Sequence, residues 1–152
     1  MGLRERSFRR SLWLYHFNAT SCNACEIEIL AAICPRYDPE RLGVKLVGSP
    51  RHADILLVAG PCNRYVAPIL KKIYEQMPEP KIVVAVGTCA CGKGVWYDSY
   101  AIVGVDEVIP VDVYIPGCPP RPYLIAAGLA EAAKLLEAKA AKMAELEKKG
   151  KR

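Results

Sequence analysis

Cysteine is the residue type in this sequence that offers the clearest chemistry. The 152 residues include seven cysteines, an odd number and a lower density than in a small secreted disulfide scaffold. Cys22 and Cys25 have the C-x-x-C spacing, whereas Cys89 and Cys118 come from distant segments. Thiolates in such arrangements bind iron–sulfur clusters or zinc, and a C-x-x-C pair alone can act as a redox dithiol.

The cellular compartment decides which of these chemistries is open to the thiols. The first ten residues are basic, but neither a sustained apolar run nor a small-residue cleavage site follows them, so we do not expect a secretory signal. In a reducing compartment, clustered cysteines bind metals or exchange electrons more often than they form structural disulfides. We therefore expect a metal or redox site.

Hydrophobic patterning predicts the elements that must position these thiols. Near-continuous apolar runs that end at glycine are typical of strands buried on both faces, and they alternate here with helical patterns. This alternation predicts one doubly wound α/β domain with a parallel sheet and a long C-terminal helix. The expected strands are 13–17, 44–47, 53–59, 81–86 and 111–115, and the expected helices are 23–34, 67–76 and 119–146.

Three local features complete this expected organisation. Asn23 and Glu26 form a capping-box-like pair at the start of the first helix. The glycine-rich stretch 87–100 is expected to be a loop. The apolar spacing of the last helix fades after Leu136, so we expect its final turns to be exposed.

The predicted sheet gathers most of the thiols at one edge, because the carboxyl ends of parallel strands lie together and ligands bind there. The exception is Cys34, at a helix end before Pro35, which we expect to pack in the core as a small hydrophobic residue. The cysteines expected at the shared edge are Cys22, Cys25, Cys62, Cys89, Cys91 and Cys118.

Three kinds of site fit thiols that are brought together in this way. A [4Fe–4S] cluster takes four thiolates, and a C-x-x-C pair with two cysteines from distant loops can surround it. Structural zinc also takes four, but its usual pattern is two close pairs, and only Cys22 and Cys25 have that spacing. A redox dithiol would use this pair alone and leave Cys89 and Cys118 unexplained. The spacing favours the cluster, with zinc as the main rival.

Charge and hydropathy exclude several classes of protein. No apolar run approaches the roughly 20 residues that span a bilayer, so we expect no membrane crossing in this sequence. The net charge of +5 lies in the two ends of the chain, and the part between them is near neutral. Basic charge is not concentrated on the folded part, so we do not expect nucleic acid as a partner.

We divide the chain into a basic N-terminal tail (1–10), an iron–sulfur-binding α/β domain (11–135) and a basic helical C-terminal extension (136–152).

At the cysteine motifs the sequence resembles the small iron–sulfur subunit shared by respiratory complex I (the PSST-type subunit) and the membrane-bound, energy-conserving [NiFe] hydrogenases. The similarity extends from about Trp13 to Leu135. It is carried by the motifs SCNACEIE at 21–28, PRYD at 35–38, SPRHAD at 49–54, YEQMPEPK at 74–81, GTC at 87–89 and PVDVYIPGCPPR at 110–121.

The resemblance implies a flavodoxin-like fold and a [4Fe–4S] cluster, the last in an electron relay, beside a catalytic pocket shared with a larger subunit. The ligands that it implies are Cys22, Cys25, Cys89 and Cys118. Glu28 matches a family glutamate near the cluster, where it either handles protons linked to reduction or is a solvated carboxylate of the first helical turns. Arg36 and Arg51 match positions near the subunit junction, where they either hold loops by ion pairs or tune the cluster.

Departures from the family pattern bear on the branch to which the chain is related. Cys22 and Cys25 have the hydrogenase spacing instead of the adjacent cysteines of complex I, whereas the stretch 74–81 looks more like complex I. Cys62 and Cys91 are additional thiols that we expect near the cluster. They are either buried non-ligands, or one of them coordinates the cluster or reacts with a sulfur substrate. This mixture is similar to the archaeal membrane-bound sulfane sulfur reductases, and we favour that branch.

The predicted function is that of an oxidoreductase subunit that is active only within a larger complex. We expect it to pass electrons from a ferredoxin-like iron–sulfur subunit to a site shared with a large catalytic-type subunit. Membrane-embedded subunits would couple this step to ion pumping, with the chain as a peripheral subunit on the cytoplasmic face of the cell membrane. Sulfane sulfur or polysulfide is the favoured acceptor, and protons in a [NiFe] hydrogenase or quinone in a complex I-like enzyme are the alternatives. The rival of another class is a zinc-stabilised α/β binding module.

Overall fold

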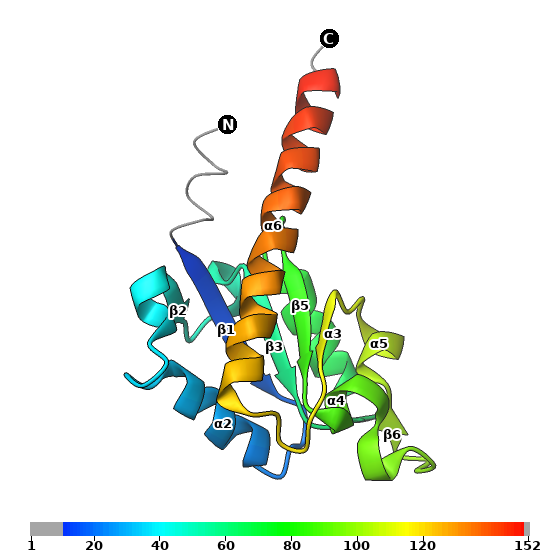
Figure 1. Cartoon of the computed structure of the whole chain (residues 1–152). Coiled ribbons are helices and arrows are strands. Elements are labelled where there is room, and N and C mark those ends of the chain that lie inside the picture. Colours follow the sequence, from blue (N-terminus) through cyan, green and yellow to red (C-terminus); the bar gives the residue numbers. More distant parts are fainter. Residues whose placement is uncertain (1–10, 151–152) are drawn as a thin grey trace.

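Five parallel strands form the central sheet of the computed structural model, which describes residues 11–150 (Figure 1). The strand order is β2-β1-β3-β5-β7, and each neighbouring pair is parallel. This is the flavodoxin-like order, so the predicted α/β fold class is confirmed. The strands are β1 (Leu12–Asn18), β2 (Val44–Leu46), β3 (Ile55–Ala59), β5 (Ile82–Val86) and β7 (Val113–Ile115).

The sheet is buried on both faces between two hydrophobic cores, because alternate side chains of each strand point to opposite sides. Every residue of β3 and β5 is buried. Helices α2 (Ala24–Ile33) and α6 (Pro122–Gly150) cover one face, where they pack on residues such as Leu57. Helix α3 (Ala67–Gln76) covers the other face together with the segment that follows β5, and Leu56 packs in that core.

The segment that follows β5 is more ordered than the sequence predicted. The stretch 87–100 was expected to be a loop, and this prediction is wrong, because the chain forms α4 (Thr88–Gly92) and the 3-10 turn η3 (Gly94–Trp96). Its glycines allow this path, since Gly87 and Gly94 both have positive φ. Ala90 then packs into the core and anchors the short helix.

A second, two-stranded sheet was not expected from the patterning. Strand β4 (Cys62–Asn63) pairs antiparallel with β6 (Ile102–Val103). The short helix α5 (Val105–Val108) follows, and Val105 is buried in the same core as α3. Strands of two residues carry no hydrophobic period, so only the tertiary fold reveals them. Two further 3-10 turns are η1 (Pro39–Leu42) and η2 (Pro50–His52).

Helix α6 extends beyond the sheet that it covers (Figure 1). Ile125 and Leu136 are buried, whereas no side chain from 141 to 146 is. Gly128 lets the helix approach the sheet, because a Cβ at this position would lie 2.4 Å from Cδ1 of Ile115. The helix is therefore held against the sheet as far as about residue 140.

The predicted division of the chain is only partly covered by the described residues. The basic tail 1–10 lies outside them, as do 151–152. The boundary expected after residue 135 falls inside the continuous helix α6. Within the described part of the chain, no helix is both long enough and apolar enough to cross a membrane.

Charged side chains fasten α6 to the amino-terminal edge of the sheet. Lys139 Nζ donates to Asp112 Oδ1 at 2.7 Å and to the Lys81 carbonyl at 3.2 Å. The other carboxylate oxygen of Asp112 accepts the backbone N–H of Val83 at 2.9 Å. Lys81 is itself buried, with its Nζ 3.9 Å from the centre of the Tyr74 ring. The Lys139–Asp112 ion pair and the hydrogen bonds around it thus hold α6 at the edge opposite to the thiols.

Candidate metal centre

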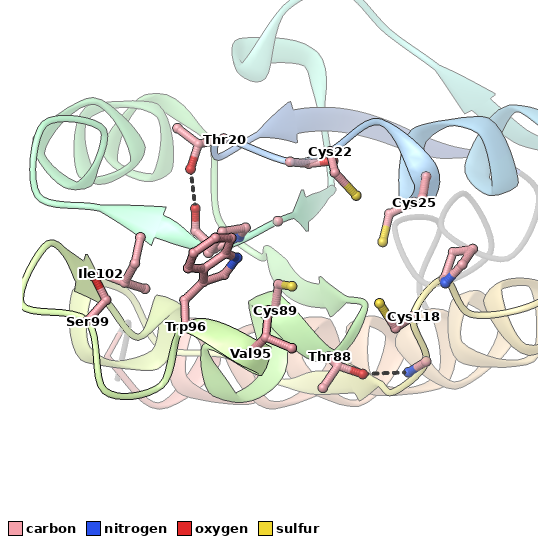
Figure 2. Close-up of a pocket in the computed structure, with 16 residues that line it drawn as sticks. Thr20, Cys22, Cys25, Thr88, Cys89, Val95, Trp96, Ser99, Ile102 and Cys118 are labelled. Carbon is pink, nitrogen blue, oxygen red and sulfur yellow. Dashed lines mark hydrogen bonds between the residues drawn. The ribbon is translucent and has the colours of Figure 1, made fainter.

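A pocket of about 490 Å³ lies at the carboxyl-terminal edge of the sheet, where the loops after β1, β3, β5 and β7 meet. Four thiols line it: Cys22 and Cys25 follow β1, Cys89 follows β5 and Cys118 follows β7. Figure 2 shows their sulfur atoms turned toward a common space between the loops. The structure thus brings together the four cysteines for which the sequence predicted a shared site.

The four thiols are not equally exposed. Cys25 is buried at 8% exposure and Cys89 is half-buried, whereas Cys22 and Cys118 are exposed. Burial raises the pKa of the Cys25 thiol to about 11, and the charges of Glu26 and of the other three pocket thiols add to this rise. Burial also raises the pKa of Cys89, with contributions from Cys118 and Cys22. Thiolates here would repel one another, so deprotonation of the set calls for a cation.

The loop that carries Cys22 is held by its own polar side chains. Asn18 Oδ1 accepts the backbone N–H groups of Thr20 at 2.9 Å and Ser21 at 2.8 Å. The Ser21 hydroxyl donates to Glu26 and accepts the Asn23 N–H at 3.0 Å.

The predicted capping role of Asn23 is wrong. Asn23 precedes α2 with φ of 68° and makes no side-chain cap hydrogen bond. The backbone of Asn23 lies in the left-handed region before the helix. The partner of the Glu26 carboxylate is therefore the Ser21 hydroxyl, and not Asn23 as in a capping box. A serine two residues upstream of the expected cap was the signal available in the sequence.

Backbone hydrogen bonds tie the Cys89 loop to the Cys118 loop. The N–H of Gly87 donates to the Ile115 carbonyl, and that of Thr88 donates to the Gly117 carbonyl, both at 2.8 Å. Thr88 Oγ1 accepts the Gly117 N–H in return at 3.4 Å (Figure 2). On the other side of the pocket, the Thr20 hydroxyl donates to the Pro61 carbonyl at 2.6 Å. The relative positions of the loops are therefore set by the fold.

The outer wall of the pocket comes from residues that sequence reasoning missed. Val95, Trp96, Ser99 and Ile102 line the side away from Cys118, and Figure 2 shows the Trp96 indole standing between the thiols and Ile102. The signal in the sequence was a run of large apolar side chains, 95–97, inside a glycine-rich stretch. Such a run in a short turn indicates a wall or an interface.

The three other cysteines lie outside this pocket. Cys62 is fully buried in the core under α3, and its Sγ lies 3.8 Å from the Asn63 carbonyl oxygen. Cys91 packs against the same core, with its Sγ 3.5 Å from the Ala85 carbonyl oxygen. Cys34 was predicted to pack in the core, and this prediction is wrong, because it is exposed. Helix α2 ends at Ile33, and the extended backbone of Cys34 turns its side chain away from the buried face.

The charged residues implied by the family resemblance do not line the pocket. Glu28 lies half-buried on α2, three residues after Cys25. Arg36 is exposed in the turn after α2. Arg51 is exposed in η2, which precedes β3 and so lies toward the amino-terminal edge of the sheet. Their proposed roles stay predictions.

A buried pair of polar groups lies beneath the Cys22 loop. His16 Nε2, on β1, is 3.7 Å from Oε1 of Glu26, and neither atom has a hydrogen-bond partner among the described residues. Burial lowers the pKa of His16, and the Glu26 charge opposes this shift only in part. The imidazole is therefore neutral in the folded chain at neutral pH.

The arrangement of donors can be tested against the kinds of group that thiolates bind. Among the described residues, no three His, Cys, Asp or Glu side chains lie close enough together to hold a single metal ion. The four thiols instead surround the space of the pocket. A cluster places several iron and sulfide atoms between its cysteine ligands, so spaced donors are what it requires. The donor set fits an iron–sulfur cluster.

Residues 22–132 match the protein family described as "NADH ubiquinone oxidoreductase, 20 Kd subunit". The chain belongs to this family. Members of the family are oxidoreductase subunits, which agrees with the resemblance and the enzyme class expected from the sequence motifs.

Relatives of the chain come from several kinds of complex. It is 57% identical over 121 residues to the "Probable membrane-bound hydrogenase subunit mbhJ" of Pyrococcus furiosus, with 79% of this chain and 72% of that protein covered. It is 45% identical to a subunit of the NADH-quinone oxidoreductase of Geotalea uraniireducens, covering 84% of this chain and 74% of that one. In the solved membrane-bound sulfane sulfur reductase, an archaeal respiratory complex, a chain 34% identical superposes with a TM-score of 0.77, covering 90% of this chain and 76% of that one.

Acidification should destabilise the folded chain through His16. Its folded pKa is lowered from 6.5, so the unfolded chain binds the proton first as the pH falls. The contribution of neutral His16 to the free energy of unfolding is therefore complete above pH 6.5, and it is lost as the pH falls toward the pKa of His16 in the folded chain. Urea unfolding between about pH 5 and pH 8 should show this slope, and H16Q should flatten it. His52, the only other histidine, is exposed, and an equal effect of H52Q would contradict the assignment.

Proposed function

We propose that this chain is an electron-transfer subunit that binds a [4Fe–4S] cluster through Cys22, Cys25, Cys89 and Cys118. The observation that carries the proposal is the convergence of these four thiols, from the ends of three strands, on one pocket. Four cysteine thiolates are the usual ligand set of such a cluster. Membership in the family of the 20 kDa oxidoreductase subunit supports the same role.

Zinc is the rival occupant that the cysteine count allows. In a four-cysteine zinc site each sulfur lies about 2.3 Å from the metal, so all four must gather around one point. The described thiols surround a pocket of about 490 Å³ instead. Binding of one zinc ion would require the loops to close inward, because no three of the described donors lie close enough together to hold a single ion, whereas a pocket of this size leaves room for a polynuclear cluster.

When bound, the cluster would supply one-electron transfer. Cys25 and Cys89, the two less exposed thiols, would hold its inner side from α2 and α4. Val95, Trp96 and Ile102 would limit the access of water from the outer wall. An apolar wall of this kind lowers the local dielectric constant and thereby affects the reduction potential.

An exposed apolar surface adjoins the pocket and supports docking of a protein partner. The exposed fractions of its members range from 55% to 88%, and aromatic side chains of this kind are enriched in interfaces. Two members, Val95 and Trp96, also line the pocket, so a partner bound here would cover the thiols. We define this docking surface by Tyr65, Val95, Trp96, Tyr97 and Tyr100.

The proposed partners follow from the kinds of complex in which relatives occur. A large catalytic-type subunit would cover the docking surface and accept the electrons, and a ferredoxin-like iron–sulfur subunit would deliver them. Two relatives are named as parts of membrane-bound enzymes, which supports an assembly with membrane-embedded, ion-pumping subunits. The chain would then be a peripheral subunit on the cytoplasmic face of the membrane.

Two relatives support two different electron acceptors. The hydrogenase subunit, at 57% identity, supports protons, and the sulfane sulfur reductase chain, at 34%, supports sulfane sulfur. The sequence alone favoured sulfur because of the mixture of hydrogenase and complex I features and the additional thiols Cys62 and Cys91, and these two thiols lie in the core outside the pocket. We therefore propose proton reduction with a nickel–iron partner, with sulfane sulfur reduction as the second candidate.

Metal analysis tests the cofactor. Protein purified without oxygen should contain iron and acid-labile sulfide in the ratio of a [4Fe–4S] cluster and show an EPR signal when reduced. C118S should lose or alter this signal because it removes one ligand. C34S is the matched control, since this exposed thiol lies outside the pocket and should leave the signal unchanged. A colourless protein with stoichiometric zinc and no iron would overturn the proposal.

Substitutions on the docking surface test the partner. Tyr97→Ser combined with Tyr100→Ser should reduce copurification of the large subunit with the tagged chain by at least tenfold, because buried interface tyrosines often contribute about 2 kcal/mol or more. Leu146→Ser, exposed near the far end of α6, is the control and should retain the partner. Full retention by the double variant would show that the partner docks elsewhere.

Assays of the intact complex distinguish the acceptors. The complex, isolated from its membrane and supplied with a reduced ferredoxin, should evolve hydrogen from protons. Production of sulfide from polysulfide without hydrogen would favour the second candidate instead. Reduction of a quinone alone would count against both and favour the complex I-like alternative.

A further inference from the structure

Two glycines stand directly behind the two inner sulfurs of the pocket. A Cβ on Gly87 would lie 2.6 Å from Cys25 Sγ, and a Cβ on Gly94 would lie 2.9 Å from Cys89 Sγ. Real Cβ atoms essentially never approach a heavy atom this closely. Each sulfur therefore rests against a backbone that carries no side chain.

Both contacts are part of tightly folded backbone. The Gly87 position is also 3.5 Å from the Gly117 carbonyl oxygen and 4.0 Å from Pro120 Cδ, so atoms of the Cys118 loop surround it. The Gly94 position is 3.2 Å from Cys89 Cα and 3.3 Å from its nitrogen, because η3 folds back over α4. The backbone angles agree, with φ of +89° at Gly87 and +57° at Gly94.

An ion pair holds the turn that brings Gly94 to its sulfur. Lys93 has φ of 64°, and its Nζ lies 2.7 Å from Glu107 Oε1 on α5. Gly104 leaves room for this carboxylate, because a Cβ there would lie 3.0 Å from the same oxygen. The turn after α4 is thus linked to helix α5 by the Lys93–Glu107 ion pair.

Other glycines with positive φ near the pocket serve a different purpose. A Cβ on Gly60 would meet the backbone of Ser21, and one on Gly117 would meet the backbone of Pro120, each within 2.6 Å. These two glycines let loops pass each other. Of the glycines whose surroundings the structure describes, Gly87 and Gly94 are the ones that meet a thiol.

We propose that Gly87 and Gly94 are positioning residues that fix the two inner ligand sulfurs of the cluster, and this inference rests on the proposed function. Productive sites tolerate displacements of only about 0.5 Å. A methyl group at position 87 would push the Cys25 sulfur by most of an ångström. The smaller conflict at position 94 would shift the Cys89 sulfur without expelling it. Among the glycines whose surroundings are described, none meets the sulfur of Cys22 or Cys118, the two exposed thiols.

Alanine substitutions in the full-length chain test this proposal. G87A should lower the iron content of anaerobically purified protein at least threefold, because one inner ligand is displaced. G94A should retain the cluster but shift its EPR g values and its midpoint potential. Thermal unfolding of each variant, followed by circular dichroism, should show that the fold is preserved.

Two control variants separate the sulfur contacts from other effects of alanine. G92A lies at the end of α4, where a Cβ would meet no atom within 4 Å, and should match the wild type. G43A introduces alanine at φ of 90°, nearly the value at Gly87, in the turn before β2 and outside the pocket. A loss of stability that it shares with G87A reports on alanine at positive φ and not on the contact with the Cys25 sulfur.

The outcomes distinguish this inference from the proposed function. If the wild-type chain carries the cluster and both G87A and G94A match G92A in iron content, g values and potential, the positioning role is wrong and the electron-transfer role stands. If G87A fails to fold, G94A alone tests the positioning role: shifted g values and a shifted midpoint potential support it, and values equal to those of G92A contradict it. A wild-type chain that binds no iron overturns both proposals, because no ligand sulfurs remain to be positioned.

Discussion

Four thiols that would repel one another as thiolates are held around one pocket because the parallel strands end at the same edge of the sheet. Burial and mutual charge raise the pKa of Cys25 to about 11, so the apo chain keeps this thiol protonated at neutral pH. A bound cationic centre would reverse that preference, and the fold would have to keep the sulfurs at the separation that the centre requires. The two buried cores, the strand order and the hydrogen-bonded loops all serve this placement.

The pocket has an inner side built by the fold and an outer side left open. The inner sulfurs of Cys25 and Cys89 rest on backbone, and the loops that carry them are tied to neighbouring loops. The outer thiols, Cys22 and Cys118, are exposed, and the apolar wall of Val95, Trp96 and Ile102 lines the side of the pocket away from Cys118. In the proposed function this difference in exposure is useful, because Cys25 and Cys89 would hold the cofactor from the buried side and Cys22 and Cys118 would lie on the side that faces a partner.

Much of the fold and the grouping of the thiols follow from the sequence, and the details that do not are set by tertiary contacts. The helix Ala67–Gln76 has the predicted bounds because prolines mark both ends. The shared edge follows from the rule that parallel strands end together. Cys34 and Ser21 could not be placed in this way, since the exit angle of α2 and the left-handed turn before it decide where their side chains point. The contacts of Gly87 and Gly94 join residues that no periodic pattern connects.

Strand β7 lies at the border of the sheet, so a metal centre bound to Cys118 would affect how firmly this strand is held. This strand has three residues and, among the described strands, pairs only with β5, while Cys118 follows it closely in the chain. A metal centre bound to Cys118 and to the cysteines after β1 would act as a cross-link that staples the border strand to the interior of the sheet. Loss of such a centre would remove this cross-link and leave β7 held by its pairing with β5 and its packing against α6, so cofactor loss would weaken the border of the sheet, where strands can pair with other chains.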